Sequence, residues 1–175
     1  MPIMIKQESQ EDYQKTEELV KQAFLQAEFS DQKEHELVHR IRTSDAFIPE
    51  LSLVAVDNEI VGHIMLSKIK IVNDDRTVDS LALAPISVSP NQQKKGIGSL
   101  LITHALKKAK ELGYESVIVL GHQDYYPKFG FKQASLWNIK SPFEVPAKVF
   151  MAMELTKDAL KNIRGVVQYS QAFFE

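Results

Sequence analysis

The segment ISVSPNQQKKGIGSLL, residues 86–101, strongly constrains what this chain can fold into. An apolar strand runs into a turn with two lysines and two glycines, and a helix starts at once. The first amides of a helix have no partners within it, and the helix dipole makes that end partly positive. Gly96 and Gly98 carry no side chain, so a phosphate can approach those amides closely. The turn therefore suits a diphosphate, although a basic glycine turn can also be no more than the start of a helix.

Two common phosphate-binding motifs do not fit this turn. A Walker loop ends in glycine, lysine and then serine or threonine, and that ending is missing here. A dinucleotide-binding fingerprint needs three glycines in the order G-x-G-x-x-G, followed about 20 residues later by an acidic residue. The order here is Q-x-x-G-x-G, without a third glycine at the required spacing. We therefore expect no nicotinamide cofactor.

The rest of the chain predicts an α/β sandwich around a mixed sheet. Its hydrophobic periodicity gives the order strand, two helices, three strands, helix, strand, short helical turn and further strands. Ser9 is a candidate cap for the first helix, and Ser30 or Asp31 for the second. The third of the three consecutive strands is nearly all apolar or small after Ser80, which indicates burial on both faces. The expected elements cover residues 1–7, 9–24, 30–44, 50–57, 59–72, 76–90, 98–114, 115–122, 123–131, 147–155 and 164–174.

Composition excludes several classes of protein. A chain of 175 residues fits one domain with a substantial core, and its net charge of −2 gives no basic field for nucleic acid. The absence of cysteine excludes disulfides, thiolate metal sites and a cysteine nucleophile, and no paired-histidine spacing predicts a metal site. No apolar window approaches the roughly 20 residues of a spanning helix, and the first residues are too polar for a signal peptide. We expect a cytoplasmic protein with no membrane partner.

Two motifs resemble those of GCN5-related N-acetyltransferases, the GNAT superfamily. YYPKFGF, residues 125–131, resembles the tyrosine-x-x-x-glycine-phenylalanine sequence of that superfamily. V-x-P-x-x-Q-x-x-G-x-G, from Val88 to Gly98, resembles its acetyl-CoA loop, and the two motifs lie in the right order. The segments RTSDAFIPELSLVAVDNEIVGHIMLS and VLGHQDYYPKFGF are similar to the bacterial YhbS-type group of predicted N-acetyltransferases. The resemblance implies a single GNAT domain over residues 1–175, with a mixed, mostly antiparallel sheet flanked by helices.

The resemblance also implies where acetyl-CoA, the expected co-substrate, binds. In similar enzymes the strand before the loop splays from its neighbour, and its unpaired backbone binds the pantetheine arm. Pro85, which has no amide, fits a strand whose ladder breaks there. An amide near Ile86 would polarise the thioester carbonyl like an oxyanion hole. The implied cofactor-binding residues are Ile86, Ser87, Val88, Gln93, Lys94, Lys95, Gly96, Ile97, Gly98 and Ser99.

Tyr126 occupies the position of the catalytic tyrosine in the resemblance. A tyrosine with a pKa of about 10 can donate a proton to the departing CoA thiolate, whose thiol has a pKa of about 8.5. Tyr126 is therefore the expected general acid. The alternative is an aromatic ring that packs against Phe129 and Phe131, and packing is also the expected role of Tyr125.

The general base is less clearly marked. Many relatives carry a glutamate on or beside the loop-bearing strand, but LALAPISVSP has no carboxylate. His122, at the end of a strand, is the candidate, since imidazole titrates near neutrality. His63 either lines the acceptor pocket or is simply hydrogen-bonded. Asp45 and Glu50 either contact a cationic acceptor or are solvated. The asparagine often found before the catalytic tyrosine is also missing, because GHQD stands there.

The expected reaction is acetyl transfer from acetyl-CoA to an amine by direct attack on the thioester, with no metal. The alternative is a regulatory module that binds an acyl-CoA with little or no transfer. The acceptor is expected to be a small-molecule or peptide amine, and sequence alone names neither it nor the preferred acyl length. Pocket residues are expected on the first two helices and on the loop of residues 134–148, where Trp137 and Phe143 line an acceptor site or cap the core. The apolar terminus QAFFE is compatible with a homodimer.

Overall fold

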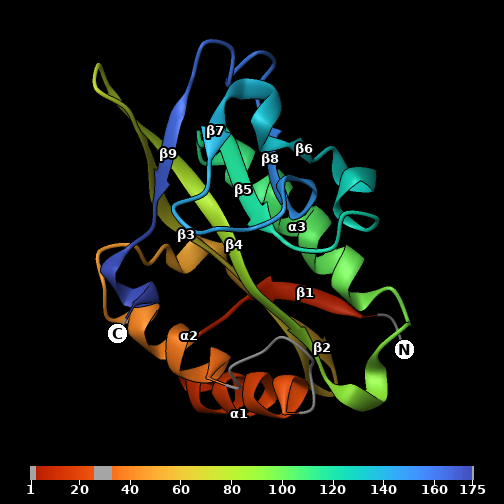
Figure 1. Ribbon diagram of the computed structural model, residues 1–175. Coiled ribbons are helices and arrows are strands. Elements are labelled where there is room, and N and C mark those ends of the chain that lie inside the picture. The colour runs from red at the N-terminus through yellow and green to blue at the C-terminus, as the bar shows by residue number, and fades with distance from the viewer. Residues whose placement is uncertain (1–2, 26–32, 175) are drawn as a thin grey trace.

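A computed structural model describes residues 3–25 and 33–174, which form a mixed sheet flanked by helices (Figure 1). Strand order is β1-β2-β3-β4-β5-β8-β6, with β9 paired to β3 and β7 paired to β9. All neighbouring strands are antiparallel except the pairs β4–β5 and β7–β9. The strands are β1 (Met4–Gln7), β2 (Ser52–Asp57), β3 (Glu59–Val72), β4 (Thr77–Val88), β5 (Ser116–Leu120), β6 (Lys132–Gln133), β7 (Ile139–Lys140), β8 (Phe150–Glu154) and β9 (Gly165–Gln168). This confirms the predicted fold class.

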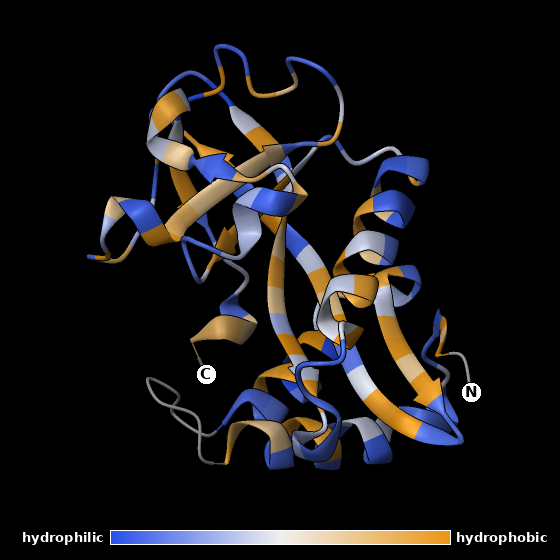
Figure 2. Ribbon diagram, turned by 90° about the vertical axis from the view of Figure 1, so that its right-hand side faces the viewer, coloured by the Kyte–Doolittle hydropathy of each residue, from blue (hydrophilic) through white to orange (hydrophobic). Residues whose placement is uncertain are grey.

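Three α-helices cover the two faces of the sheet. They are α1 (Tyr13–Phe24), α2 (Glu34–Arg42) and α3 (Ile97–Glu111). Alternation along β3 separates the faces, because Ile64 and Leu66 pack with the buried residues of α3, while Met65 packs with those of α1 and α2. Each helix carries hydrophobic residues toward the sheet and hydrophilic ones outward (Figure 2). The short 3-10 turns are η1 (Gln10–Asp12), η2 (Pro49–Leu51), η3 (Pro90–Gln92), η4 (Tyr126–Phe129), η5 (Ala134–Trp137), η6 (Ala147–Val149) and η7 (Gln171–Phe173).

Ser9, the candidate cap of the first helix, caps the 3-10 turn η1 that precedes α1. The backbone N–H of Ser9 donates to Asp12 Oδ2 at 3.0 Å, which organises η1 before α1 begins at Tyr13. A 3-10 turn therefore replaces the first part of the helix expected from residue 9. The caps considered for the second helix, Ser30 and Asp31, lie outside the described residues.

Strand β4 departs from β5 after two paired residues, and this divergence positions the site. The pairing with β5 covers only Leu81 and Ala82. On its other side β4 pairs with β3, where the register shifts between Ile64–Ile86 and Leu66–Leu83, so that β4 carries one extra residue. Pro85 lies in this bulge, where its missing amide breaks no ladder bond. The predicted burial on both faces holds from Ser80 to Leu83, and beyond Leu83 buried and half-buried residues alternate.

The C-terminal segment packs back onto α2. Ala172 is buried, and its carbonyl accepts a hydrogen bond from Arg40 Nε at 2.8 Å. Phe173 is partly buried against the same cluster, whereas Phe174 is exposed. Much of the apolar terminus that we considered as a dimer surface is therefore used within the chain. Within residues 3–25 and 33–174, no helix is long and apolar enough to cross a bilayer.

Candidate active site

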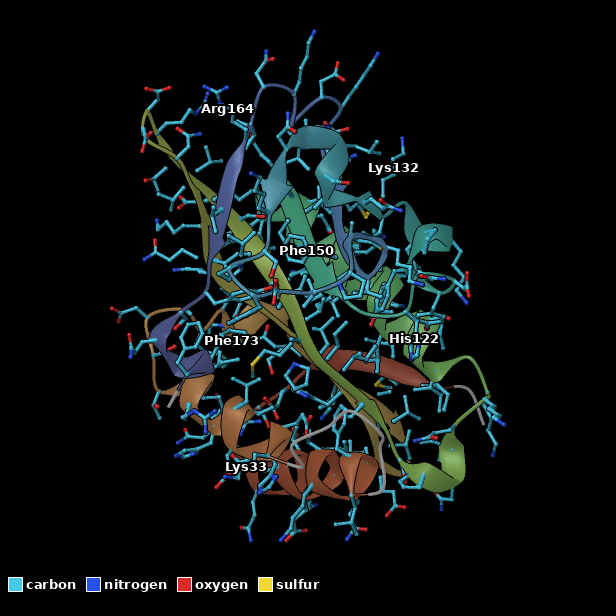
Figure 3. All side chains as sticks on the ribbon, viewed as in Figure 1. Lys33, His122, Lys132, Phe150, Arg164 and Phe173 are labelled. Carbon is cyan, nitrogen blue, oxygen red and sulfur yellow. The ribbon has the colours of Figure 1, made fainter. Side chains whose placement is uncertain are left out.

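A cavity of about 530 Å³ lies where β4 and β5 diverge. It is lined by the bulged part of β4, the end of β5, the loop that follows β5, and residues of α1, α2 and the C-terminal segment. His122 and Phe173, which both line it, lie on opposite sides of β4 in the view of Figure 3. The lining residues are Phe24, Glu34, Leu37, Ala82, Leu83, Ala84, Pro85, Ile86, Ile118, Leu120, Gly121, His122, Tyr126, Phe143, Tyr169 and Phe173.

The β4 segment predicted to hold a pantetheine arm borders this cavity only in part. Ile86 lines it, while Ser87 and Val88 do not. The Ser87 hydroxyl is buried without a hydrogen-bond partner, and Ser87 pairs with His63 across the β3–β4 ladder. The backbone of β4 beyond Ala82 has no ladder partner on the β5 side. Ser87 and Val88 would therefore bind a ligand through backbone amides and carbonyls rather than through side chains.

The glycine turn leads into α3 through two left-handed residues. Lys94 has φ 67° and Gly96 has φ 81°, and Gly96 is the N-cap. No side chain caps the helix, so none competes for its first amides. Gln93 Nε2 donates to the Val88 carbonyl at 3.1 Å and closes the turn onto the end of β4. Ile97 is 2% exposed and anchors the first helical residue in the core.

The turn η4 ties the start of α3 to the loop after β5. The Tyr125 hydroxyl lies 3.0 Å from Ser99 Oγ, and Lys128 Nζ lies 4.2 Å from the centre of the Tyr125 ring. Tyr125 was expected only to pack, and it does meet Phe129 edge to face, but it also makes this polar contact. Tyr125 does not line the cavity, whereas Tyr126 does.

Tyr126 is buried against Gly121, which follows β5. A Cβ atom on Gly121 would lie 2.4 Å from the Tyr126 ring, so only glycine leaves room for it. The ring also meets Phe131 edge to face, with centroids 5.7 Å apart. Burial, with a smaller contribution from Tyr125, raises the pKa of Tyr126 to about 12. Tyr126 therefore packs against Phe131, as the packing alternative expects, while Phe129 meets Tyr125 instead. Tyr126 also lines the cavity, and its role as a general acid stays a prediction.

His122 is exposed and lines the same cavity as Tyr126. Its carbonyl accepts the backbone N–H groups of Tyr125 at 3.2 Å and Tyr126 at 3.3 Å. The residue therefore fixes the start of the tyrosine turn through its backbone, while its imidazole is accessible to a ligand.

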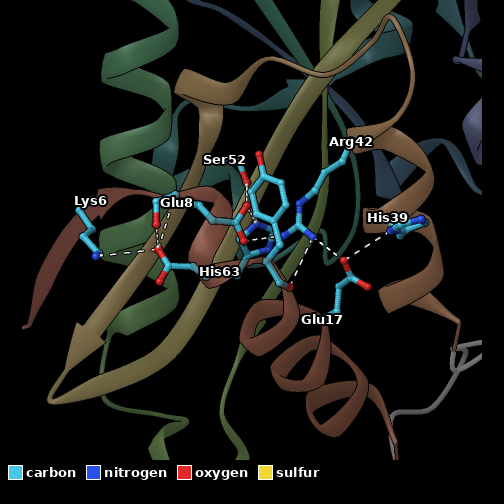
Figure 4. A network of polar contacts seen from close by, with 10 residues as sticks. Lys6, Glu8, Glu17, His39, Arg42, Ser52 and His63 are labelled. Atoms are coloured by element: carbon cyan, nitrogen blue, oxygen red, sulfur yellow. Dashed lines mark hydrogen bonds and ion pairs between the residues drawn. The ribbon is translucent and has the colours of Figure 1, made fainter.

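His63 lies in a buried polar network instead of the cavity (Figure 4). Its Nε2 is 3.0 Å from Ser52 Oγ and 4.0 Å from Glu8 Oε1, and burial, reinforced by Arg42, lowers its pKa to about 3. Arg42 pairs with both Glu8 and Glu17 at 2.5 Å. Of the two alternatives for His63, the structure favours the hydrogen-bonded core histidine.

Other residues considered for the acceptor are scattered. Asp45 and Glu50 are exposed and do not line the cavity. Trp137 packs against the core near β8 and β9, whereas Phe143 lines the cavity. Phe24, Glu34 and Leu37 also line it and come from the first two helices, where pocket residues were expected without being named. Tyr169 and Phe173 line it too, and sequence reasoning missed them because the C-terminal segment is distant in the chain. Among the residues that the structure describes, no group of three or more side chains is arranged to hold a metal ion.

The structure thus places Tyr126 and the unpaired segment of β4 at one cavity, and the glycine turn at the start of α3 follows β4. The model of the Acetyltransferase (GNAT) family matches residues 6–131. The chain belongs to this family.

Bacterial relatives and solved structures agree with this assignment. Uncharacterized N-acetyltransferase YhbS of Escherichia coli K12 is 29% identical over 153 residues, which cover 86% of this chain and 89% of that protein. Uncharacterized N-acetyltransferase YjhQ of Escherichia coli K12 is 32% identical over 120 residues, 67% of this chain and 66% of that protein.

Two solved structures resemble the whole described chain. Escherichia coli YhbS in complex with CoA superposes with a TM-score of 0.88 at 24% identity and covers 99% of this chain and 92% of that one. A GNAT family acetyltransferase from Brucella melitensis in complex with acetyl-CoA has a TM-score of 0.81 at 30% identity and covers 98% of both chains.

Proposed function

We propose that residues 1–175 act as one N-acetyltransferase domain that transfers an acetyl group from acetyl-CoA to an amine. The observation that carries this proposal is the shared cavity of Tyr126 and the unpaired, bulged segment of β4. The Brucella melitensis protein, 30% identical over nearly the whole chain, was solved with acetyl-CoA, which supports the choice of co-substrate.

In this proposal acetyl-CoA spans the cavity and the glycine turn. The pantetheine arm would add to β4 along Ile86–Val88, where the β5 side of the backbone is open. The diphosphate would lie on the amides of Lys94–Ser99, because an uncapped helix N-terminus favours an anion. Lys94 and Lys95 are exposed there and add positive charge. The described residues fit such binding without a metal.

Transfer would proceed by one attack on the thioester carbonyl. The neutral amine nitrogen forms the C–N bond, the carbonyl oxygen becomes an oxyanion held by an amide near Ile86, and the C–S bond then breaks. The nitrogen loses a proton to His122, directly or through water, and Tyr126 donates a proton to the departing thiolate. The N-substituted acetamide and CoA then leave. The nitrogen has lost one proton to His122 and the thiolate has gained one from Tyr126, so the step balances.

The raised pKa of Tyr126 is compatible with this role. A phenol with a pKa of about 12 holds its proton across the physiological range, so the donor form is always present. The same apolar surroundings destabilise the thiolate that forms beside it, which raises the proton affinity of the leaving group as well. His122 is exposed and lines the same cavity, so its imidazole is within reach of both a ligand and solvent.

An acyl-CoA-binding regulatory module is the second candidate, favoured by the absence of a carboxylate on β4 near the bulge. The two are separated by measuring acetyl-CoA binding by calorimetry and acetyl transfer across a panel of amines with a thiol-release assay. Binding together with turnover of at least one amine supports the transferase. Tight binding without turnover of any amine would instead identify the module.

A further inference from the structure

We infer that the acceptor is a small primary amine carried on an apolar group, preferably an aromatic one. This inference rests on the proposed function and names the substrate class of the same site. It comes from the part of the lining that α1, α2, the loop after β7 and the C-terminal segment contribute, which includes Phe24, Leu37, Phe143, Tyr169 and Phe173. A volume of about 530 Å³ is in the range of small-molecule sites, roughly 300–1,000 Å³, which favours a free amine over a protein surface.

Aromatic rings from two distant segments form one wall of this part of the cavity. Phe143 stacks on Tyr169 with centroids 5.8 Å apart and 20° between the planes, and Tyr169 meets Phe173 at 5.1 Å. Phe143 is 45% exposed, so a ligand can cover its ring. Burial raises the pKa of Tyr169 to about 12, so its phenol is neutral at physiological pH. An aromatic acceptor would exchange water for ring contacts on this wall.

The charge of the lining favours one cation and disfavours other charges. Glu34 is the single carboxylate among the lining residues of the described chain, and no lysine or arginine lines the cavity. Glu34 would attract the protonated amine, which gives its first proton to solvent before the neutral nitrogen attacks and its second to His122 after the C–N bond forms. No lysine or arginine among the described lining residues would pair with the carboxylate of an acceptor that carries one. A polyamine would place its second cation against apolar walls, where an unpaired charge is strongly disfavoured.

The first test compares acceptors that differ in one feature. With saturating acetyl-CoA, 2-phenylethylamine should show a kcat/KM at least ~10-fold above that of ethylamine, because even single apolar groups in a fitted pocket contribute about 10-fold or more. It should also exceed phenylalanine, which adds a carboxylate, and spermidine, which adds cations. A preference for spermidine, ethylamine or phenylalanine would overturn the inference.

The second test uses matched variants of the wall and of the carboxylate. Phe143→Ala should raise the KM for 2-phenylethylamine by roughly 3- to 10-fold, the value of one aromatic pair, with little change for ethylamine. Phe174→Ala is its control, because Phe174 contacts Phe143 but does not line the cavity. Glu34→Gln should raise the KM several-fold for every amine, and Glu36→Gln, in the same first turn of α2, should not. Equal effects of Phe143→Ala on both amines would count against the aromatic wall.

Binding experiments separate failure of this inference from failure of the proposed function. The affinity of the unchanged protein for acetyl-CoA is measured first by calorimetry. If the protein does not bind acetyl-CoA, the proposed function itself is refuted. If acetyl-CoA binds but no amine is turned over, 2-phenylethylamine and ethylamine are titrated into the CoA-loaded protein. Tighter binding of 2-phenylethylamine that is weakened by Phe143→Ala supports the acceptor class. Equal or weaker binding than ethylamine overturns it.

Discussion

The hydroxyl of Tyr125 lies 3.0 Å from Ser99 Oγ, and this contact ties the tyrosine turn to the first turn of α3. It therefore links the segment that carries Tyr126 to the helix start proposed for the diphosphate. A Cβ atom on Gly98 would also lie 3.4 Å from the same hydroxyl, so the two segments are in close contact.

Tyr125→Phe removes this link and keeps the ring. A net hydrogen bond contributes about 1 kcal/mol, or about fivefold in an equilibrium constant, so CoA affinity should fall several-fold. Titration calorimetry of both proteins with CoA measures the change. Ser99→Ala should produce a similar loss, and the double variant should lose little more than either single one. Fully additive losses would show that the two groups act independently.

Tyr126→Phe tests the proposed general acid. The variant keeps the packing against Gly121 and Phe131 and removes only the proton donor. General acid catalysis contributes ~10²–10⁴-fold, so kcat should fall by that order while CoA affinity stays the same. Single-turnover kinetics with the best acceptor measures the chemical step. An undiminished rate would make Tyr126 a packing residue and leave proton donation to solvent or His122.

Gly98→Asp tests the proposed diphosphate site. The nearest atom to a Cβ on Gly98 is 3.4 Å away, and its backbone is not left-handed, so the variant should fold. Its carboxylate would stand where a phosphate belongs, and CoA binding should be abolished. His104→Asp adds the same charge to an exposed position of α3 and should bind CoA normally. Unchanged affinity in folded Gly98→Asp would remove the turn from the site.

Because the pKa of His63 is lowered in the folded protein, we predict a loss of stability in mild acid. Its pKa is about 3 in the folded protein and about 6.5 when unfolded, so between these values the unfolded chain binds the extra proton. The free energy of unfolding should therefore fall as pH drops below 6.5, by about 2 kcal/mol from pH 7.5 to pH 5. Urea titrations at both pH values measure this. In His63→Gln the free energy of unfolding should differ much less between pH 7.5 and pH 5. In His104→Gln, which changes an exposed position of α3, the difference should stay as in the unchanged protein.

We predict that substitution of Arg42 lowers the free energy of unfolding strongly, because its ion pair is buried. Its side chain is 4% exposed and pairs with Glu8, whose side chain is fully buried. Arg42→Met leaves a buried carboxylate without its partner, which should lower the free energy of unfolding by about 3–5 kcal/mol. Arg164→Met, which removes an exposed pair with Asp75 at 3.8 Å, should change it by about 1 kcal/mol or less. Adding Glu8→Gln to Arg42→Met should recover part of the loss. Equal changes in the free energy of unfolding for Arg42→Met and Arg164→Met at pH 7.5 would contradict a stabilising role of the buried pair.

Sequence by itself determined the features that depend on neighbours along the chain. The alternation in β3, the cap at Ser9 and the glycine turn before α3 are local, because backbone geometry and helix ends are set by residues a few positions apart. The same holds for the placement of Tyr126 four residues before Gly130, which ends η4 in a left-handed conformation. These short-range patterns sufficed for the fold class and for locating the glycine turn and Tyr126 along the chain, while their roles in the site stay predictions.

The tertiary structure alone decided which distant residues share the cavity and which are buried away from it. Phe24, Glu34, Phe143 and Phe173 meet there because α1, α2, the loop after β7 and the C-terminal segment converge on the gap between β4 and β5. No periodicity links such segments, because their contacts depend on how the elements pack. For the same reason the sequence pattern around His63 left two roles open. The packing of α2 against β3 puts Arg42 and a desolvated core beside that imidazole, which keeps it neutral and out of the cavity.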